Sequence, residues 1–386
     1  MDADLLIVGA GPAGCSTALH LVAREPSWAG RVLVLDRARF PRPKLCGGGI
    51  THFGYRQLEA LGLGELECFG AGTIRARYRG REVAFHGEPT VRVVRREVFD
   101  HGLLEAVRER DVAVREGAEV RGVEVLADRV ELTLGSGEVL AAAAVVGADG
   151  SGSRVRRALG WPGRSAVAGT LEVLAPVDPE VDPEHRERAM TLDFSPMSSH
   201  RLAGYTWAFP ALVEGRPHTS LGVYDSRIVA GRRRADLEAL VVELVEGRGL
   251  EAAALARHSF PIRLWDGRSP ISGPRALLVG DAAGADPLLG EGIPFALAHG
   301  EAAAESVLAA AASGDWRFAD HFARAVAHPV LRQLPTRVAV ARIFYRLRNP
   351  VLLTTIWLVV ARLVRNLDAA GRAWHAAEGL HGRLRR

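Results

Sequence analysis

The sequence predicts an α/β fold in which two domains are interleaved along the chain and followed by C-terminal helices. Three segments far apart in the sequence, 5–14, 147–150 and 277–284, form or follow apolar strands and end in turns of glycine and aspartate. The 386 residues exceed one typical domain, and no low-complexity linker divides them. Two threaded domains with a sizeable core are therefore expected.

The first segment has the context of a dinucleotide-binding βαβ unit. In such a unit Gly9 permits the tight turn, Gly11 lets the backbone approach a pyrophosphate, and Gly14 lets the helix pack on the strand. The helix N-terminus offers unpaired N–H groups and a positive dipole to the phosphates. Asp36 follows the next expected strand, 31–35, and would accept hydrogen bonds from a ribose. The candidate binding residues of this unit are Gly9, Gly11, Ala13, Gly14, Asp36 and Arg37.

Short strands and one helix follow in the pattern. Residues 73–78 and 81–86 resemble the two strands of a hairpin inserted from the second domain. Apolar residues at helical spacing predict a helix over 98–110. Further strands are expected over 120–125, 129–134 and 138–146. The last of them is followed by Asp149 and Gly150, two further candidate cofactor-binding residues.

The region 161–271 is strand-rich and predicts an antiparallel sheet that carries the substrate pocket. Alternation places Tyr205, Trp207 and Phe209 on one face of a strand that Pro210 is expected to end. Such an aromatic face suits a long hydrocarbon substrate, and it suits an ordinary core equally well. The expected elements are strands over 170–174, 190–194, 205–209 and 221–224, and a helix over 234–246.

The third segment has the most mechanistic content. A strand over 276–279 ends in Gly280 and Asp281, and Pro294 suits the first turn of a long helix that runs to about residue 312. In a flavin site, the start of that helix would face the edge of the isoalloxazine ring where negative charge collects when the flavin is reduced. The positive end of the helix dipole would stabilise that charge by about 1 kcal/mol. Together the three turns predict one FAD site. The candidate residues of this turn are Gly280, Asp281, Gly290, Gly292 and Ile293.

These elements divide the chain into three parts. The predicted Rossmann-like FAD-binding domain takes residues 1–70, 94–160 and 272–327, and the antiparallel-sheet substrate domain takes 71–93 and 161–271. Residues 328–386 form a basic and apolar C-terminal helical region.

Composition narrows location and partners. Three cysteines without metal-ligand spacing favour a reducing cytoplasm over a disulfide framework, and no metal is expected. The first strand begins at once, which leaves no room for a signal peptide, and no apolar run reaches the roughly 18 residues of a membrane span. Basic and aromatic residues are not interleaved as in nucleic-acid-binding proteins, so no nucleic acid partner is expected.

The C-terminal region is unusually basic, with eleven arginines between residues 329 and 386. Its apolar stretch, 350–364, is too short to span a bilayer but suits the interface of one, which would place the protein at the inner face of the cell membrane. The same helices would equally cap the substrate domain or form a dimer contact. The flanking cations are Arg346, Arg348, Arg362 and Arg365.

Several segments resemble the geranylgeranyl reductase family of flavoproteins, which share the aromatic-hydroxylase fold. Residues 43–49, Pro-Lys-Leu-Cys-Gly-Gly-Gly, resemble that family's Cys-Gly-Gly-Gly segment, and residues 205–210, Tyr-Thr-Trp-Ala-Phe-Pro, match its YxWxFP motif. Residues 280–284 and 290–293 resemble its third flavin motif. The similarity extends from residue 1 to about residue 312.

The resemblance implies reduction of an unactivated C=C bond in an isoprenoid chain. Reduced FAD would give a hydride from N5 to one alkene carbon, and an acid of the protein would protonate the other. Cys46 is the first candidate for that acid because an ordinary thiol is mostly protonated at neutral pH, although a cysteine is often an inert buried residue. His52 and Tyr205 are the reserve candidates.

The resemblance also assigns binding residues. Arg96 lies in a segment similar to the RxxFD motif whose arginine contacts FAD, although a solvated surface arginine is the alternative for this position. The cofactor-binding candidates from this source are Cys46, Gly47, Gly48 and Arg96, and the substrate-binding candidates are Tyr205, Trp207 and Phe209.

Two other functions share these features. A monooxygenase or halogenase of the same fold would use oxygen, and Lys44, the only lysine, is the one available for a halogenase. A flavin-dependent electron carrier would not need the aromatic second domain. With one dinucleotide fingerprint, the electrons are expected from transiently bound NAD(P)H or from a reduced ferredoxin-like partner.

Overall fold

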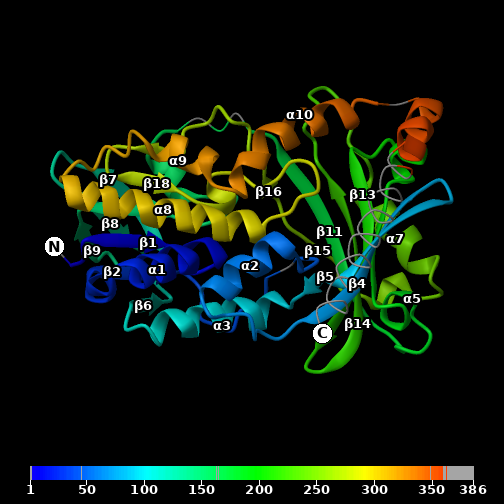
Figure 1. Ribbon diagram of the computed structural model, residues 1–386, viewed down its shortest axis with the longest axis horizontal. Helices are drawn as coiled ribbons and strands as arrows, with labels where there is room; N and C mark the ends of the chain where they lie inside the picture. The colour runs from blue at the N-terminus through cyan, green and yellow to red at the C-terminus, as the bar shows by residue number, and fades with distance from the viewer. Residues whose placement is uncertain are drawn as a thin grey trace, which may run out of the picture.

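The computed structural model describes residues 2–44, 46–161, 163, 165–347, 349–359 and 362. Figure 1 shows a layered α/β domain at one end of the molecule and a tall sheet at the other. Helix α8 (Ile293–Ser313) runs along the first domain, and α10 (Leu334–Phe344) crosses toward the sheet.

The first domain is built on a six-stranded sheet in the order β17-β18-β10-β1-β2-β6. Neighbouring strands pair in parallel except for β17, which is antiparallel to β18. The central strands β1, β2 and β10 are buried along their whole length and are apolar except for Asp36 at the end of β2, as expected where both faces are covered. The strands are β1 (Leu5–Val8), β2 (Val32–Asp36), β6 (Ala113–Glu116), β10 (Ala144–Gly147), β17 (Ser272–Gly273) and β18 (Ala276–Leu278).

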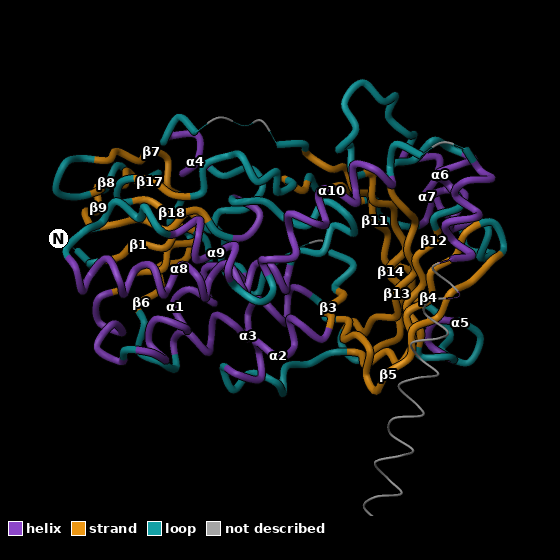
Figure 2. Tube along the Cα trace, turned by 45° about the horizontal axis from the view of Figure 1, so that its top comes forward, coloured by secondary structure: helices purple, strands orange, loops and turns teal. Residues whose placement is uncertain are grey.

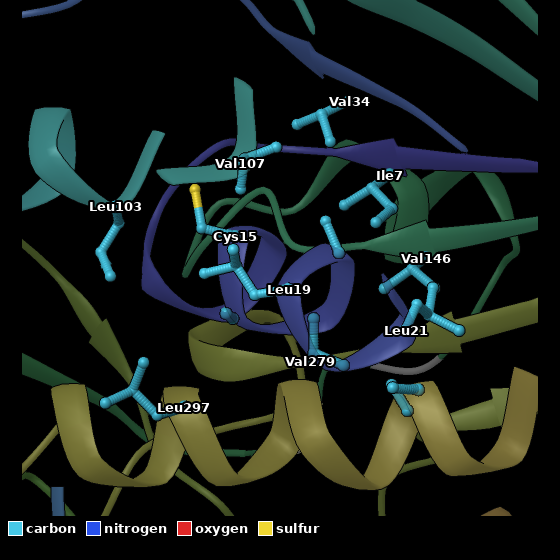
Figure 3. Close-up of a cluster of buried hydrophobic side chains, with 14 of the residues drawn as sticks. Ile7, Cys15, Leu19, Leu21, Val34, Leu103, Val107, Val146, Val279 and Leu297 are labelled. Atoms are coloured by element: carbon cyan, nitrogen blue, oxygen red, sulfur yellow. The ribbon is translucent and has the colours of Figure 1, made fainter. Parts of the chain in front are cut away.

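Helices cover one face of this sheet and a small antiparallel sheet covers the other. Figure 3 shows side chains of β1, β2 and β10 meeting those of α1, α3 and α8 on the helical side. The sheet β7-β8-β9 packs on the opposite face through an apolar cluster of its own. These elements are α1 (Pro12–Arg24), α2 (His52–Ala60), α3 (Arg96–Arg108), α4 (Arg154–Ala158), β7 (Val120–Val125), β8 (Val130–Leu134) and β9 (Val139–Ala142).

The second domain is a nine-stranded sheet with the path β15-β11-β14-β13-β12-β4-β5-β3, to which β16 is added beside β11. Figure 2 shows it standing across the end of the first domain. Helix α7 (Leu237–Glu246) packs on one face, and the other face points to the first domain. The strands are β3 (Gly49–Thr51), β4 (Phe69–Tyr78), β5 (Arg81–Val93), β11 (Val167–Pro176), β12 (Ala189–Asp193), β13 (Gly204–Val213), β14 (Arg216–Asp225), β15 (His258–Ser259) and β16 (Ile262–Arg263).

The C-terminal helices pack against the second sheet. Phe344 and Tyr345 at the end of α10, and Leu353 and Trp357 of the helical segment 350–359, join the apolar cluster that covers its first-domain side. The opposite side of these helices keeps Ile343, Val351, Leu352, Leu358 and Val359 exposed. The segment predicted over 350–364 is thus described only in part, because residues 360, 361, 363 and 364 lie outside the described residues, as do the flanking Arg348 and Arg365.

Three local predictions are wrong. The strand expected over 138–146 is two strands, because β9 pairs in the small sheet whereas β10 pairs with β1. The second sheet is not wholly antiparallel, since β12 lies parallel to β4. Pro210 does not end β13: the strand continues to Val213, and the missing N–H is tolerated because Pro210 pairs with β14 beyond the last residue that pairs with β12.

Candidate active site

The three glycine turns meet at the carboxyl ends of β1, β10 and β18. A Cβ atom added to Gly9 would strike the carbonyl oxygen of Ala148 in the second turn. One added to Gly280 would lie 2.8 Å from the Cβ of Ala13, so the third turn rests on the first. Gly14 packs equally closely on Gly9. Segments more than a hundred residues apart therefore form one surface at the edge of the sheet.

The first turn is shaped to receive a phosphate. Gly11 is the N-cap of α1, with no side chain capping the first N–H groups, so these groups and the positive end of the helix dipole are available to an anion. Arg42 adds a cation, because its Nη2 would lie 3.8 Å from a Cβ on Gly11. Arg42 has no local signature in the sequence, because its position depends on the path of the loop after β2.

Asp36 and its neighbour lie where the adenosine end of a dinucleotide would bind. The Asp36 carboxylate accepts the backbone N–H groups of Ala10 and Ala38, both at 2.8 Å, which orients it at the end of β2. Each carboxylate oxygen keeps a further lone pair for a ribose hydroxyl. Arg37 beside it is exposed.

The second turn contains an unsatisfied buried atom. Asp149 Oδ2 accepts the N–H groups of Arg154 and Val155 and so caps α4, whereas Asp149 Oδ1 is buried and has no partner among the described residues. Gly150 next to it has φ +77° and open space in front of it. A buried acceptor that lacks a donor costs about 1–3 kcal/mol, which a ligand group would recover. The turns therefore fit FAD in shape and in donor set.

Arg96 is largely enclosed, with 11% of its side chain exposed, and it lies beside Cys46. Its guanidinium makes two bonds to Asp100, at 2.7 and 2.8 Å, and a further contact to the Cys46 side chain. Asp100 is fully buried and also accepts Arg42 at 3.0 Å. The alternative of a solvated surface arginine does not apply to this position.

The third turn is set by Asp281 and the start of α8. Asp281 Oδ2 accepts the Ser151 hydroxyl at 3.1 Å, which ties the second turn to the third. Gly292 is the N-cap of α8, its added Cβ would lie 3.8 Å from Asp281 Oδ1, and Ile293 is the first residue of the helix. Gly290 has φ +68° and lies on the ring of Tyr224.

The loop 286–291 before α8 is held by three tyrosine hydroxyls, here called the tyrosine clamp: Tyr205, Tyr224 and Tyr345. They donate to the successive carbonyls of Leu289, Pro287 and Leu288, respectively. The clamp joins β13, β14 and the residue after α10 to one loop.

An ion-pair network supports the same loop. Arg337 of α10 pairs with Asp286 at 2.8 Å and with Glu291 at 3.1 Å. Thr51 donates to the other oxygen of Glu291. Asp286 is fully buried, so the C-terminal helix supplies the charge that balances it.

The Cys-Gly-Gly-Gly segment lies directly against the aromatic face of β13. A Cβ on Gly47 would lie 2.9 Å from the Phe209 ring and 3.3 Å from Trp207 Nε1, so only glycine fits there. Gly48 needs its positive φ of +79° beside the backbone of Val94. The two motifs that the sequence separates by more than 150 residues are thus in contact.

The aromatic face extends well beyond the predicted three residues. Successive ring centroids lie 6.1 Å apart for Phe209 and Trp207, 6.5 Å for Trp207 and Tyr205, 5.4 Å for Tyr205 and Phe194, and 5.7 Å for Phe194 and Trp357. The row therefore ends on the C-terminal helical segment. Its members are buried, which suits apolar contacts.

The three candidate acids occupy different surroundings. Cys46 is partly buried beside Arg96, and its Sγ accepts the N–H of Gly48 at 3.4 Å. Tyr205 donates its proton to the Leu289 carbonyl, and burial, with Asp286 and Glu291 nearby, raises the pKa of its hydroxyl far above the usual range. His52 is exposed at the start of α2, where its ring contacts Phe53, itself 49% exposed. Of the three, only Cys46 is partly buried and donates to no acceptor among the described residues: the Tyr205 hydroxyl is engaged by Leu289, and His52 is exposed.

Lys44 lies next to this group. Burial lowers the pKa of its ammonium to about 7, with Arg96 adding to the shift and Asp281 opposing it. Its Nζ faces the ring of Phe260. The only lysine is therefore on the cofactor side of the second sheet.

A cleft of about 640 Å³ opens beside β6, away from the aromatic row. Charged groups line it, which does not suit a hydrocarbon. They include Arg39, Arg115, Glu116, Glu119, Arg121 and Glu138.

Comparison with known proteins agrees with this geometry. The family model described as an FAD binding domain matches residues 2–315. The chain is 30% identical to menaquinone reductase of Mycobacterium tuberculosis over 97% of this chain and 95% of that protein. It is 32% identical to digeranylgeranylglycerophospholipid reductase 1 of Methanopyrus kandleri over 82% and 83% of the two chains.

Solved structures share the fold. A geranylgeranyl bacteriochlorophyll reductase-like protein from Thermoplasma acidophilum superposes with a TM-score of 0.73 at 20% identity, over 91% of this chain and 89% of that chain. A point mutant of the halogenase PltM in complex with FAD superposes with a TM-score of 0.71 at 18% identity, over 96% of this chain and 84% of that chain.

The parallel sheet, the three meeting turns and the family match define an FAD-dependent oxidoreductase. Within that class, the chain belongs to the geranylgeranyl reductase family. The expected fold class, an α/β protein with a Rossmann-like FAD-binding domain, is confirmed.

Proposed function

We propose that this protein reduces C=C bonds in the geranylgeranyl or polyprenyl chain of a lipid, diphosphate or quinone. The observation that carries the proposal is the close approach of Gly47 to Trp207 and Phe209, since Cys46 directly precedes Gly47 and contacts Arg96. The names of the relatives, one acting on menaquinone and one on a digeranylgeranyl phospholipid, support a substrate of this chemistry.

The proposed site has residues for holding the cofactor, for orienting the substrate and for giving a proton. When bound, FAD supplies the hydride for one alkene carbon. The turns at Gly11, Asp149 and Asp281, with Arg42 and Arg96, hold the cofactor. The aromatic row orients the hydrocarbon and excludes water, and Cys46 gives a proton to the second alkene carbon.

NAD(P)H or a reduced ferredoxin-like protein is proposed as the electron donor. We also propose a cytoplasmic protein that binds the inner face of the membrane through the exposed apolar side of 343–359. No helix in the described ranges is long and apolar enough to cross a bilayer. An interfacial position would bring a lipid-linked chain to the end of the aromatic row at Trp357.

The test is anaerobic. The FAD-loaded protein is reduced, geranylgeranyl diphosphate or a polyprenyl quinone is added, and flavin reoxidation is followed with product mass. A product heavier by two hydrogens per bond is expected. Cys46→Ala should slow reduction by about 100-fold, whereas Cys68→Ala, a partly buried cysteine outside the site, should not.

An oxygen-dependent halogenase is the second candidate, because Lys44 is near Asp281 and halogenases share the fold. If the reduced protein leaves every alkene untouched and gives a hydroxylated or halogenated product only when air and halide are admitted, the reductase proposal is wrong.

A further inference from the structure

Glu172 is a buried carboxyl in the middle of the apolar sheet face. It lies on β11, where Leu171 and Val173 point to α7 and Glu172 points the other way, toward the Cys-Gly-Gly-Gly segment. It is 4% exposed. A buried carboxyl usually has a partner of opposite charge, and the ion pair of Glu172 is a long one, 3.9 Å between Arg95 Nη1 and Glu172 Oε1.

Its hydrogen bonds connect the two motifs of the site. Ser220 donates to Glu172 Oε1 at 2.8 Å, and Trp207 Nε1 donates to Ser220 at 3.0 Å. The backbone N–H of Cys46 donates to the same carboxyl. Gly222 makes room for this arrangement, because a Cβ there would overlap the Trp207 indole. Glu172 is thus hydrogen-bonded to the backbone of Cys46, the residue that bears the thiol.

Glu172 has a sheet neighbour that is exposed to solvent. In the sheet it pairs directly with His258 of the edge strand β15, so the two side chains share a face. His258 is exposed. The groups that face Glu172 are therefore Ser220 from β14, His258 from β15, Arg95 before α3, and Cys46 from the loop.

We infer that Glu172 is the buried acid that returns a proton to Cys46 after each turnover, and that His258 supplies it from solvent. This inference rests on the proposed function. Burial raises the pKa of Glu172, against the opposing effects of Ser220 and Arg95, and so favours its protonated form. Glu172 acts through Cys46 and is a positioning and proton-supplying residue.

The steps balance. One alkene carbon receives a hydride, which carries both electrons of the reduction, and the adjacent carbon takes the proton of the Cys46 thiol. Glu172 then gives its proton to the thiolate and becomes a carboxylate. A proton from solvent water then reaches Glu172 through the imidazole of His258.

The first test measures the protonation of the Glu172 carboxyl in the absence of substrate. Infrared difference spectra of the FAD-loaded protein at pH 7 should contain the C=O band of a protonated carboxyl, and Glu172→Gln should remove it while keeping acceptors for Ser220 and Cys46. Glu184→Gln is the matched control, because Glu184 is equally buried but paired with Arg248 at 2.8 Å, away from the aromatic row. That variant should keep the band.

The second test reads turnover. Glu172→Gln should lower kcat for alkene reduction at least about 10-fold with little change in KM. If Glu172 supplies the proton, wild-type kcat should fall at high pH as Glu172 loses its proton, and the variant should lack that contribution. His258→Ala should slow turnover and be rescued by added imidazole, whereas His86→Ala, an exposed histidine on β5, should behave as wild type.

The outcomes separate the two ideas. Absence of the band in wild type, or full kcat in Glu172→Gln, overturns the proton-supply inference even if alkenes are reduced. If wild type reduces no alkene, the proposed function fails. In that case the infrared band still decides whether Glu172 stores a proton.

Discussion

At the scale of single residues, motif positions could be predicted and their partners could not. Gly9, Gly14 and Gly280 were predictable because a tight turn and a close approach demand glycine at fixed local spacing. Arg42 and Glu172 carry no local signature, since each gains its role from a segment distant in sequence. Contacts of this kind arise only from the packing of the two domains.

Arg42 yields a prediction about cofactor affinity. Because its guanidinium faces the N-terminus of α1 at Gly11, Arg42→Ala should weaken FAD binding by about 10–100-fold. This loss corresponds to the free energy of one charge-assisted hydrogen bond to phosphate. Asp100 keeps Arg96 as its partner, so the fold should survive. Flavin fluorescence titration at two salt concentrations measures the change.

Arg317→Ala removes an arginine that is 77% exposed and bound to Asp315, and it serves as the control. Equal FAD affinity in the two variants would show that Arg42 does not contact the phosphates.

At the scale of elements, hydrophobic periodicity located most helices and strands but not their partners. The predicted helix 98–110 is α3, shifted by two residues, and the predicted strand 120–125 is β7. The strand over 138–146 was mispredicted because Ala142 and Ala144 are both apolar, and periodicity cannot show that the chain changes sheets between them. The parallel pairing of β12 with β4 likewise depends on the long connection between them.

The helical segment 350–359 has two apolar sides, and only one is used inside the molecule. Leu353 and Trp357 are buried, whereas Leu352 and Leu358 are 45% and 50% exposed between the exposed cations Arg346 and Arg362. The protein should therefore sediment with vesicles that contain phosphatidylglycerol, less so at high salt. A Leu352→Glu, Leu358→Glu double variant should bind at least about 10-fold more weakly.

Val181→Glu is the control for adding a carboxylate to an exposed apolar position, since Val181 is 70% exposed far from this helix in the sequence. Wild-type protein that stays in the supernatant at low salt would contradict the membrane proposal.

At the scale of the whole molecule, buried histidines make stability depend on pH. Burial lowers the pKa of His20 and His321 to about 4 and that of His299 to about 3, from 6.5. The unfolded chain therefore binds more protons below pH 6.5. Stability is fully present above 6.5 and is lost as the pH falls toward 4, by about 1.4 kcal/mol per pH unit for each histidine.

His299 isolates one of these contributions. Both of its ring nitrogens are buried without a partner among the described residues, so His299→Leu removes a titrating group without breaking a hydrogen bond. The free energy of unfolding of the variant, measured in urea between pH 6.5 and 4.5, should fall less steeply by about 1.4 kcal/mol per pH unit. His86→Leu should keep the wild-type slope, and a His299→Leu slope equal to wild type would refute the assignment.

The tyrosine clamp also bears on the order in which a new chain matures. Tyr205 and Tyr224 are synthesised before the loop 286–291, but Tyr345 and Arg337 emerge from the ribosome only after it. Until they do, the carbonyl of Leu288 lacks its donor and the carboxylates of Asp286 and Glu291 lack their cation. We therefore expect cofactor capture to be a late event in biogenesis, because a nascent chain that stops before α10 contains every glycine turn of the flavin site but lacks these contacts to its loop.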